Sequence, residues 1–203
     1  MKTFNYKFQK LKIEYNLSLL GDLDKILFVD IETTGLSSKT ASIYLIGACY
    51  YENHVWNAIQ WFADSTNAEP DIINAFFAFA SNYTTLIHFN GNQFDLPFIL
   101  GRCEKFGFSH NFNHLKGIDI YKRVALCKHF LQLPNCKHFL QLPNCKQKSI
   151  EKFLRINRED KYDGGQLIEI YKNYLSIPSS ESEELLLLHN KDDLKGMLEI
   201  LPI

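Results

Sequence analysis

The stretch VDIETTGL, residues 29–36, follows an apolar run and determines how the rest of the chain is interpreted. Asp30 and Glu32 are two positions apart at the end of an expected strand, where side chains two apart point to the same face. They can therefore share one bound ion. The TTG that follows supplies hydroxyls, backbone amides and a flexible glycine, which let the chain turn close to a phosphate. Taken alone, a D-x-E pair at a strand end is more often a solvated edge.

A second acidic stretch, NGNQFD, occupies residues 90–95. Asp95 comes after an expected strand and a glycine-containing turn, at the start of an expected helix. The ordinary interpretation is that Asp95 caps this helix and that Asn90 is a turn residue. Its functional interpretation depends on the other two stretches.

The third stretch is HNKDDL, residues 189–194. His189 and Asp193 are four residues apart on an expected helix, so they share a face, whereas Asp192 points elsewhere. Histidine can accept a proton from water near neutral pH, as phosphodiester hydrolysis requires. The ordinary interpretation is a hydrophilic helix face. Asp192 remains an alternative to Asp193 as a metal ligand.

The elements around these stretches indicate an α/β fold with a mixed central sheet and helices packed on it. β-Branched and aromatic residues at 25–32, 42–52 and 54–63 predict an antiparallel three-stranded meander. The length suits one domain over residues 1–203, with residues 1–24 as an N-terminal extension. Ser180 and Glu183 predict a capping box at the last helix. Other strands are expected at 84–90 and 114–120, and helices at 70–83, 96–106, 120–132, 148–154 and 166–175.

Composition limits the class of protein. No apolar run approaches the roughly 20 residues that cross a bilayer, and the N-terminus lacks the apolar segment of a signal peptide. A cytoplasmic protein without membrane association is therefore expected. The five cysteines are odd in number and lack C-x-x-C spacing, which favours reduced thiols over disulfides or a zinc site. No feature identifies a protein partner.

Charge is divided unevenly along the chain. Residues 101–161 carry 13 Lys and Arg against 5 Asp and Glu, whereas the rest carries 9 against 18. Such a division is expected where an acidic pocket lies beside a surface that binds a polyanion. The alternative is that folding mixes these charges over the whole surface.

A tandem nine-residue repeat, CKHFLQLPN, occupies residues 127–144. Nine residues rotate a helix by about 900°, half a turn out of phase, so one continuous helix cannot keep both copies on the core. Pro134 and Pro143 also interrupt a helix. One copy is expected to precede CKQKSIEKFL, and the other to form a loop or an extra turn.

Together, FVDIETTGL, HFNGNQFDLPFI and HNKDDL resemble the three exonuclease motifs of the DEDD superfamily, whose members have an RNase H-like fold. The likeness covers residues 25–203 and is strongest to YprB-type RNase H-like domains. It implies a metal-dependent 3′–5′ exonuclease that hydrolyses single-stranded DNA or RNA by a two-metal-ion mechanism. The alternative is a nucleic-acid-binding module of this fold that is weak or inactive in catalysis. A further alternative is an RNase H-like endonuclease, but the second and third motifs fit the exonucleases better.

The resemblance also implies roles for individual residues. His189 would activate or orient the attacking water. The metal ligands, holding two Mg²⁺ or Mn²⁺ ions, would be Asp30, Glu32, Asp95 and Asp193. The residues that match contacts to the terminal nucleotide, or that brace the second motif, are Thr33, Gly35, Leu36, Asn90 and Phe94. One departure is evident, because the histidine branch of the superfamily has four residues between His and Asp, whereas three separate His189 from Asp193. Three is the spacing of the tyrosine branch.

Overall fold

One six-stranded sheet organises the chain, of which the computed structural model describes residues 1–9, 11, 13, 15–131 and 144–201. The strand order is β1-β4-β3-β2-β5-β6. The first four strands in this order pair antiparallel, and β2–β5 and β5–β6 pair parallel. The predicted mixed sheet and antiparallel meander are confirmed. The strands are β1 (Lys2–Lys7), β2 (Ile26–Thr33), β3 (Ile43–Glu52), β4 (Val55–Phe62), β5 (Thr85–His88) and β6 (Lys116–Asp119).

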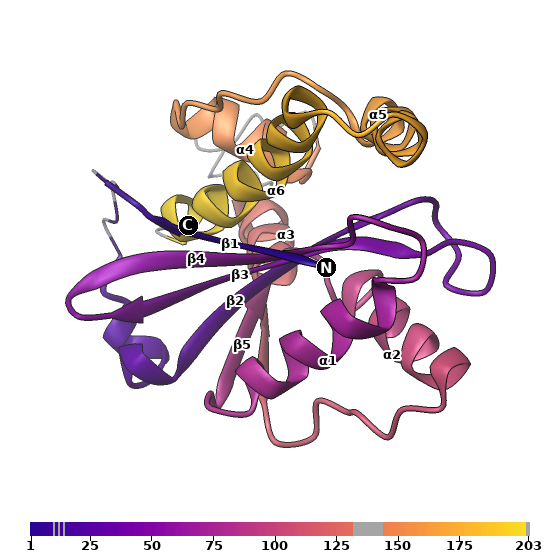
Figure 1. Cartoon of the computed structure of the whole chain (residues 1–203). Coiled ribbons are helices and arrows are strands. Elements are labelled where there is room, and N and C mark those ends of the chain that lie inside the picture. Colours follow the sequence, from indigo (N-terminus) through magenta and orange to yellow (C-terminus); the bar gives the residue numbers. More distant parts are fainter. Residues whose placement is uncertain (10, 12, 14, 132–143, 202–203) are drawn as a thin grey trace.

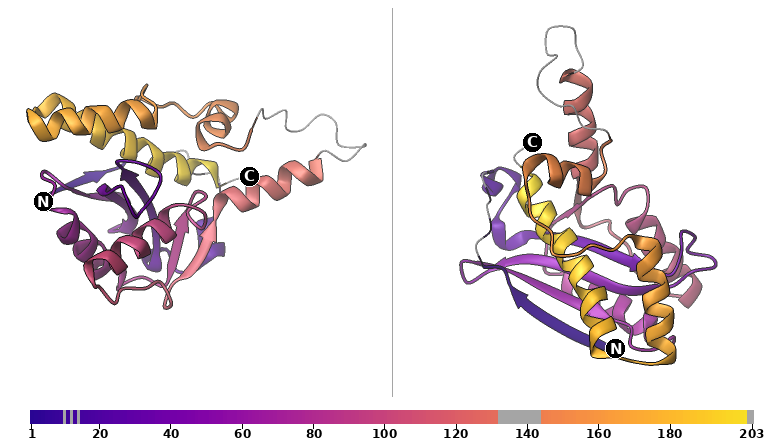
Figure 2. Two further views of the ribbon diagram at one scale, coloured as in Figure 1. Left: turned by 90° about the vertical axis from the view of Figure 1, so that its right-hand side faces the viewer. Right: turned by 90° about the horizontal axis from the view of Figure 1, so that it is seen from above.

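Helices cover both faces of the sheet, as expected of an α/β fold. α1 and α2 lie on one side, and α4, α5 and α6 lie on the other (Figure 1). α3 continues directly from β6 and projects away from the sheet (Figure 2). The helices are α1 (Glu69–Ala80), α2 (Asp95–Phe106), α3 (Ile120–Leu131), α4 (Gln147–Leu154), α5 (Gly164–Ser176) and α6 (Ser180–Ile200), and two short 3₁₀ turns span Leu17–Leu20 and Leu23–Lys25.

Alternate residues of β2 belong to different cores. Leu27 and Val29 pack in one cluster, whereas Ile26 and Phe28 pack in a second cluster with Leu194 and Met197 of α6. Since side chains alternate along a strand, Asp30 and Glu32 continue the row of Ile26 and Phe28. The pleat of β2 therefore places both carboxylates on the face that α6 covers.

Two predictions differ from the structure. Residues 2–7, assigned to an N-terminal extension, form the edge strand β1, whose register with β4 runs from Lys2 opposite Phe62 to Lys7 opposite Asn57. Ser180 was the wrong N-cap: α6 is capped by Ser179, whose hydroxyl accepts a 3.1 Å hydrogen bond from the N–H of Ser182. Ser179 has the extended backbone that a cap needs, and Ser180 is already helical.

The expectation for the nine-residue repeat concerns residues that the structure largely leaves undescribed. The repeat falls largely on residues 132–143, which lie outside the described residues, so the arrangement of its second copy stays a prediction.

Among the described cysteines, Cys49, Cys103 and Cys145 are free. No helix in the described ranges is long and apolar enough to cross a membrane.

A buried ion pair fixes the loop that follows β2. Arg102 of α2 binds both carboxylate oxygens of Glu69 of α1, at 2.7 and 2.6 Å, and both side chains are at most 3% exposed. Arg102 also donates a 2.8 Å hydrogen bond to the Ser38 carbonyl oxygen, and the N–H of Ile43 donates to Glu69. The pair therefore joins two helices to the segment between β2 and β3.

Arg102→Met is expected to lower the free energy of unfolding by about 3–5 kcal/mol, because it leaves the Glu69 carboxylate buried without its partner. Urea denaturation of both proteins measures the difference. Lys172→Met is the matched control, since it breaks the exposed Lys172–Glu169 pair, and it is expected to cost less than about 1 kcal/mol. Equal losses in the two variants would contradict the structural role of Arg102.

Candidate metal centre

Carboxylates from the three acidic stretches meet beside β2. Asp30 and Glu32 come from β2, Asp95 from the first turn of α2, and Asp193 from α6. Ligand atoms of Glu32, His189 and Asp193 all lie within 4.8 Å of one another, and Asp30, Asp95 and Asp193 line one pocket. An oxygen-rich set with one imidazole fits a divalent cation such as Mg²⁺ or Mn²⁺.

The carboxylates of this cluster are poorly neutralised. Burial, and then the negative charges of its neighbours, raise the pKa of Asp30 well above its ordinary value. Burial and the same kind of repulsion raise the pKa of Glu32, and burial raises the pKa of Asp95 to about 7. Buried carboxylates whose pKa values are raised by burial and by mutual repulsion are characteristic of functional sites, and they bind a cation readily.

Asp95 does not cap its helix. The N-cap position of α2 is Phe94, and no side chain makes a capping hydrogen bond there. The buried Asp95 carboxylate instead accepts a 3.3 Å hydrogen bond from the N–H of Ile31, between the two acidic residues of β2. This contact joins the second motif to the first and excludes the ordinary interpretation of Asp95.

Asn190 supports Asp30 from α6 and was missed in the sequence. Its amide donates a 2.8 Å hydrogen bond to Asp30 Oδ2, and its Oδ1 accepts one of 2.7 Å from Gln60. Asn190 reaches the sheet because residue 47, opposite Asp30 on β3, is glycine. A Cβ on Gly47 would lie 1.9 Å from Asn190 Oδ1.

Gly47→Ala is expected to lower the free energy of unfolding by about 1–3 kcal/mol, since α6 or Asn190 must move. Because Asn190→Ala removes the clashing side chain, the double variant should lose less than the sum of the single variants, as chemical denaturation would measure. Gly164→Ala is the control, with nothing within 4 Å of the added Cβ. Additive losses would show that the two residues do not meet.

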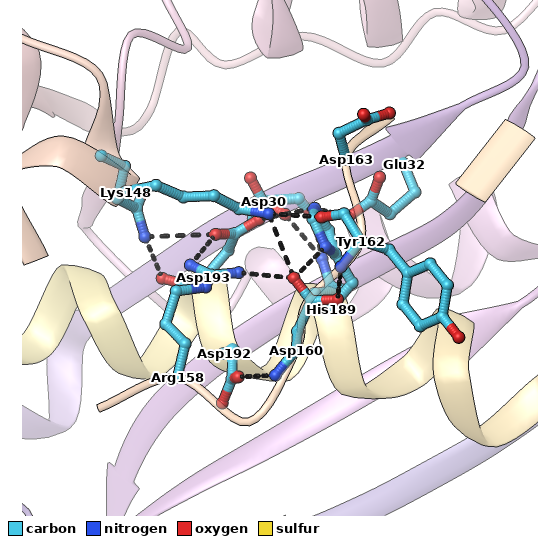
Figure 3. Close-up of polar contacts among 12 residues, drawn as sticks. Asp30, Glu32, Lys148, Arg158, Asp160, Tyr162, Asp163, His189, Asp192 and Asp193 are labelled. Atoms are coloured by element: carbon cyan, nitrogen blue, oxygen red, sulfur yellow. Dashed lines mark hydrogen bonds and ion pairs between the residues drawn. The ribbon is translucent and has the colours of Figure 1, made fainter. Parts of the chain in front are cut away.

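His189 is held from one side and faces carboxylates on the other (Figure 3). Its Nδ1 lies 2.7 Å from Asp160 Oδ2. Its Nε2 lies 3.7 Å from Glu32 Oε1 and 3.4 Å from Asp193 Oδ2. Asp160 was also missed, because it lies in an irregular segment where no spacing relates it to His189.

The neighbouring aspartates of α6 have different surroundings. Asp193 joins the cluster with Glu32 and His189. Asp192 is buried on another side, where its Oδ2 accepts hydrogen bonds of 2.7 and 2.9 Å from the N–H groups of Glu159 and Asp160. The geometry therefore favours Asp193 over Asp192 as the ligand.

A pocket of about 410 Å³ opens beside the carboxylates. Asn90 and Phe94, proposed from the sequence, lie on its wall with Asp30 and Asp95. The other lining residues are aromatic, basic or polar: Phe89, Tyr121, Cys145, Lys146, Gln147 and Lys148, together with Ile31 and Asp193. The pocket thus combines ring surfaces and cations with the acidic cluster, a combination that suits a nucleotide chain.

Thr33 and Leu36, which follow Glu32, differ in their exposure to solvent. Leu36 is 89% exposed and borders a second pocket of about 290 Å³ that Phe94 also lines. Thr33 is buried, and its hydroxyl donates a 2.8 Å hydrogen bond to the carbonyl oxygen of Gly35. Leu36 is therefore available to a ligand, whereas the Thr33 hydroxyl holds the turn.

A mixed sheet with acidic residues on its central strand, a covering helix and a pocket between them defines a nuclease-type α/β domain. The chain belongs to the RNase H superfamily, whose family model matches residues 27–202. This membership supports a nuclease function and binding of nucleic acid.

Two polymerases are similar to parts of this chain. The family B DNA polymerase from the hyperthermophilic archaeon Pyrobaculum calidifontis superposes on 87% of the chain with a TM-score of 0.64 and 12% identity, which establishes the fold. A DNA polymerase of Ostreid herpesvirus 1 (isolate France) is 43% identical over 48 residues, 23% of the chain. The matches span only 24% and 3% of these two proteins, respectively.

Proposed function

We propose that this chain is a metal-dependent 3′–5′ exonuclease that hydrolyses single-stranded DNA or RNA. The observation that carries the proposal is the meeting of Asp30, Glu32, Asp95 and Asp193 beside a pocket lined by aromatic and basic side chains. The four carboxylates would hold two divalent cations, Mg²⁺ or Mn²⁺. When bound, such cations polarise the phosphodiester and make water more acidic.

The protein's own groups have complementary tasks in this proposal. His189 Nε2, which faces Glu32 and Asp193, would orient the attacking water and accept its proton. Lys146 and Lys148 would contact backbone phosphates in the pocket, while Phe94 and the exposed Leu36 would contact the terminal base. Asn90 would brace the second motif: its N–H donates a 2.9 Å hydrogen bond to Asp119.

A 5′-labelled single strand, incubated with the protein and Mn²⁺, tests the proposal. Successive removal of nucleotides from the 3′ end produces a ladder, whereas an endonuclease produces internal cuts. The weak or inactive binding module, the alternative of a different class, retains the strand without cutting it. If Asp95→Ala degrades the strand as fast as the parent protein, the proposed site is wrong.

A further inference from the structure

The irregular segment between α4 and α5 carries two side chains that contact Asp193 and His189 of the site (Figure 3). Arg158 Nη1 lies 2.6 Å from Asp193 Oδ1, and Asp160 Oδ2 lies 2.7 Å from His189 Nδ1. Each contact uses only one polar atom of the α6 residue. The remaining atoms, Asp193 Oδ2 and His189 Nε2, lie 3.4 Å apart, and His189 Nε2 also faces Glu32.

We propose that residues 158–160 form the positioning segment of the site: Arg158 and Asp160 orient Asp193 and His189 so that Oδ2 and Nε2 face Glu32. This inference rests on the proposed nuclease function and deepens it. Neither Arg158 nor Asp160 lines the pocket, so both act through the residues that they hold.

The segment is itself fixed to α6 through its backbone. Asp192 accepts hydrogen bonds from the N–H groups of Glu159 and Asp160, at 2.7 and 2.9 Å. The segment therefore contacts the site through the side chains of Arg158 and Asp160, and contacts α6 through the backbone of residues 159 and 160. Asp192, the sequence alternative for a metal ligand, serves as the anchor of this segment.

Helix α4 supports Arg158 from the other side. Arg158 Nη1 lies 2.9 Å from Glu151 Oε2, and Gln147 of the same helix donates a 2.8 Å hydrogen bond to the Asp193 carbonyl oxygen. Glu151 is 1% exposed and packs where α6 has a glycine, since a Cβ on Gly196 would lie 1.9 Å from Glu151 Oε1. The guanidinium is thus held by three carboxylates, those of Glu151, Asp193 and, at 3.4 Å, Asp160, and its orientation is determined before any ligand binds.

The contact with Asp160 determines which nitrogen of His189 carries hydrogen. Asp160 is surrounded by donors, because it also accepts hydrogen bonds of 3.0 Å from the N–H of Tyr162 and of 3.1 Å from the Lys148 ammonium group. An ionised carboxylate only accepts hydrogen bonds, so His189 Nδ1 must be the donor. In the neutral ring, Nε2 then keeps its lone pair, as a proton acceptor requires.

Asp160→Ala is the first test. Asp160 also contacts Lys148, which is exposed enough to turn to solvent, and Arg158 Nη2, but Arg158 keeps its contacts with Glu151 and Asp193. Its kcat on the labelled strand should fall about 10- to 100-fold, as seen when residues supporting a site are removed, while KM stays within about twofold. Asp160→Asn keeps an oxygen that accepts from Nδ1, and should recover most of the lost kcat. Glu159→Ala is the matched control, since it removes one exposed carboxylate from the same segment and keeps its backbone N–H.

A second measurement does not depend on activity. Nitrogen NMR of ¹⁵N-histidine-labelled protein distinguishes protonated from unprotonated ring nitrogens at about pH 8, where free imidazole is neutral. The signals of His189, identified among seven histidines by their loss in His189→Gln, should show hydrogen on Nδ1 in the parent protein and in Asp160→Asn. In Asp160→Ala this preference should disappear.

The two measurements separate the possible failures. If the parent protein has no Mn²⁺-dependent activity but shows the expected ring nitrogens, the proposed function fails and the positioning role stands. If Asp160→Ala keeps both kcat and the parent's NMR signals, the positioning role is overturned while the nuclease function stands. If Glu159→Ala loses as much kcat as Asp160→Ala, the effect belongs to the segment's charge, which also overturns the proposal.

Discussion

Asp95→Asn is expected to abolish nuclease activity and, at the same time, to stabilise the metal-free protein. In the proposed function Asp95 helps to hold a cation that neutralises the negative charge of the transition state. Losing that cation costs several kcal/mol, so kcat/KM should fall at least about 10³-fold. The amide has nearly the same shape, and its oxygen can still accept the hydrogen bond from Ile31. Removing one charge from a repulsive, buried cluster should raise the free energy of unfolding at neutral pH by about 1–2 kcal/mol.

Activity on the labelled strand and thermal unfolding in EDTA would measure the two effects. Asp71→Asn is the matched control, since Asp71 is also acidic, in the first turn of a helix, but exposed. It should leave activity unchanged and should not stabilise the protein. A variant Asp95→Asn that loses stability along with activity would show that the Asp95 charge supports the fold.

The stability of the metal-free protein is expected to fall as pH rises from about 4 to 7, and divalent cations should reverse this fall. The pKa of Asp95 is raised from 3.8 to about 7, so in this range the folded state binds more protons than the unfolded state. Stability declines with pH under that condition, by up to about 4 kcal/mol for this shift. The raised pKa values of Asp30 and Glu32 act in the same direction.

Cations bind the deprotonated carboxylates, so their stabilising effect should grow with pH. At a hundredfold excess of Mn²⁺ over its Kd, the gain is about 3 kcal/mol. Melting curves in EDTA and in Mn²⁺, taken between about pH 5 and pH 8, should therefore diverge as pH rises. In Asp95→Asn the two curves should lie closer together. If the melting temperatures in EDTA and in Mn²⁺ differ by the same amount at every pH, then Mn²⁺ binds without displacing protons from this cluster.

The sequence was sufficient to predict the part of the site that depends on local geometry. The period of a strand places Asp30 and Glu32 on one face, and the period of a helix places His189 with Asp193 and turns Asp192 away. The structure brings these groups together with Asp95. From β2 onward, the order of strands and helices could also be predicted, because apolar periodicity and turn residues mark them.

The supporting residues could not be predicted, because their contacts depend on the approach of distant elements. Asn190 reaches Asp30 only because Gly47 leaves room on the neighbouring strand. Arg158 and Asp160 lie in a segment without periodicity, and only tertiary packing places them behind α6. The polar pattern of residues 2–7 is compatible with either an edge strand or an extension, and pairing with β4 decides between them.

The hydrogen bond between Asn190 and Asp30 joins positions 160 residues apart. A ribosome that has translated the sheet and α1 to α5 has therefore produced most of the hydrophobic core and three of the four clustered carboxylates, but neither Asp193 nor His189. Docking of α6 closes the longest loop in the fold, and such distant contacts form late because of their entropic cost. The nascent chain consequently cannot bring these acidic groups together until Asp193 has left the exit tunnel, so the candidate metal centre is completed last.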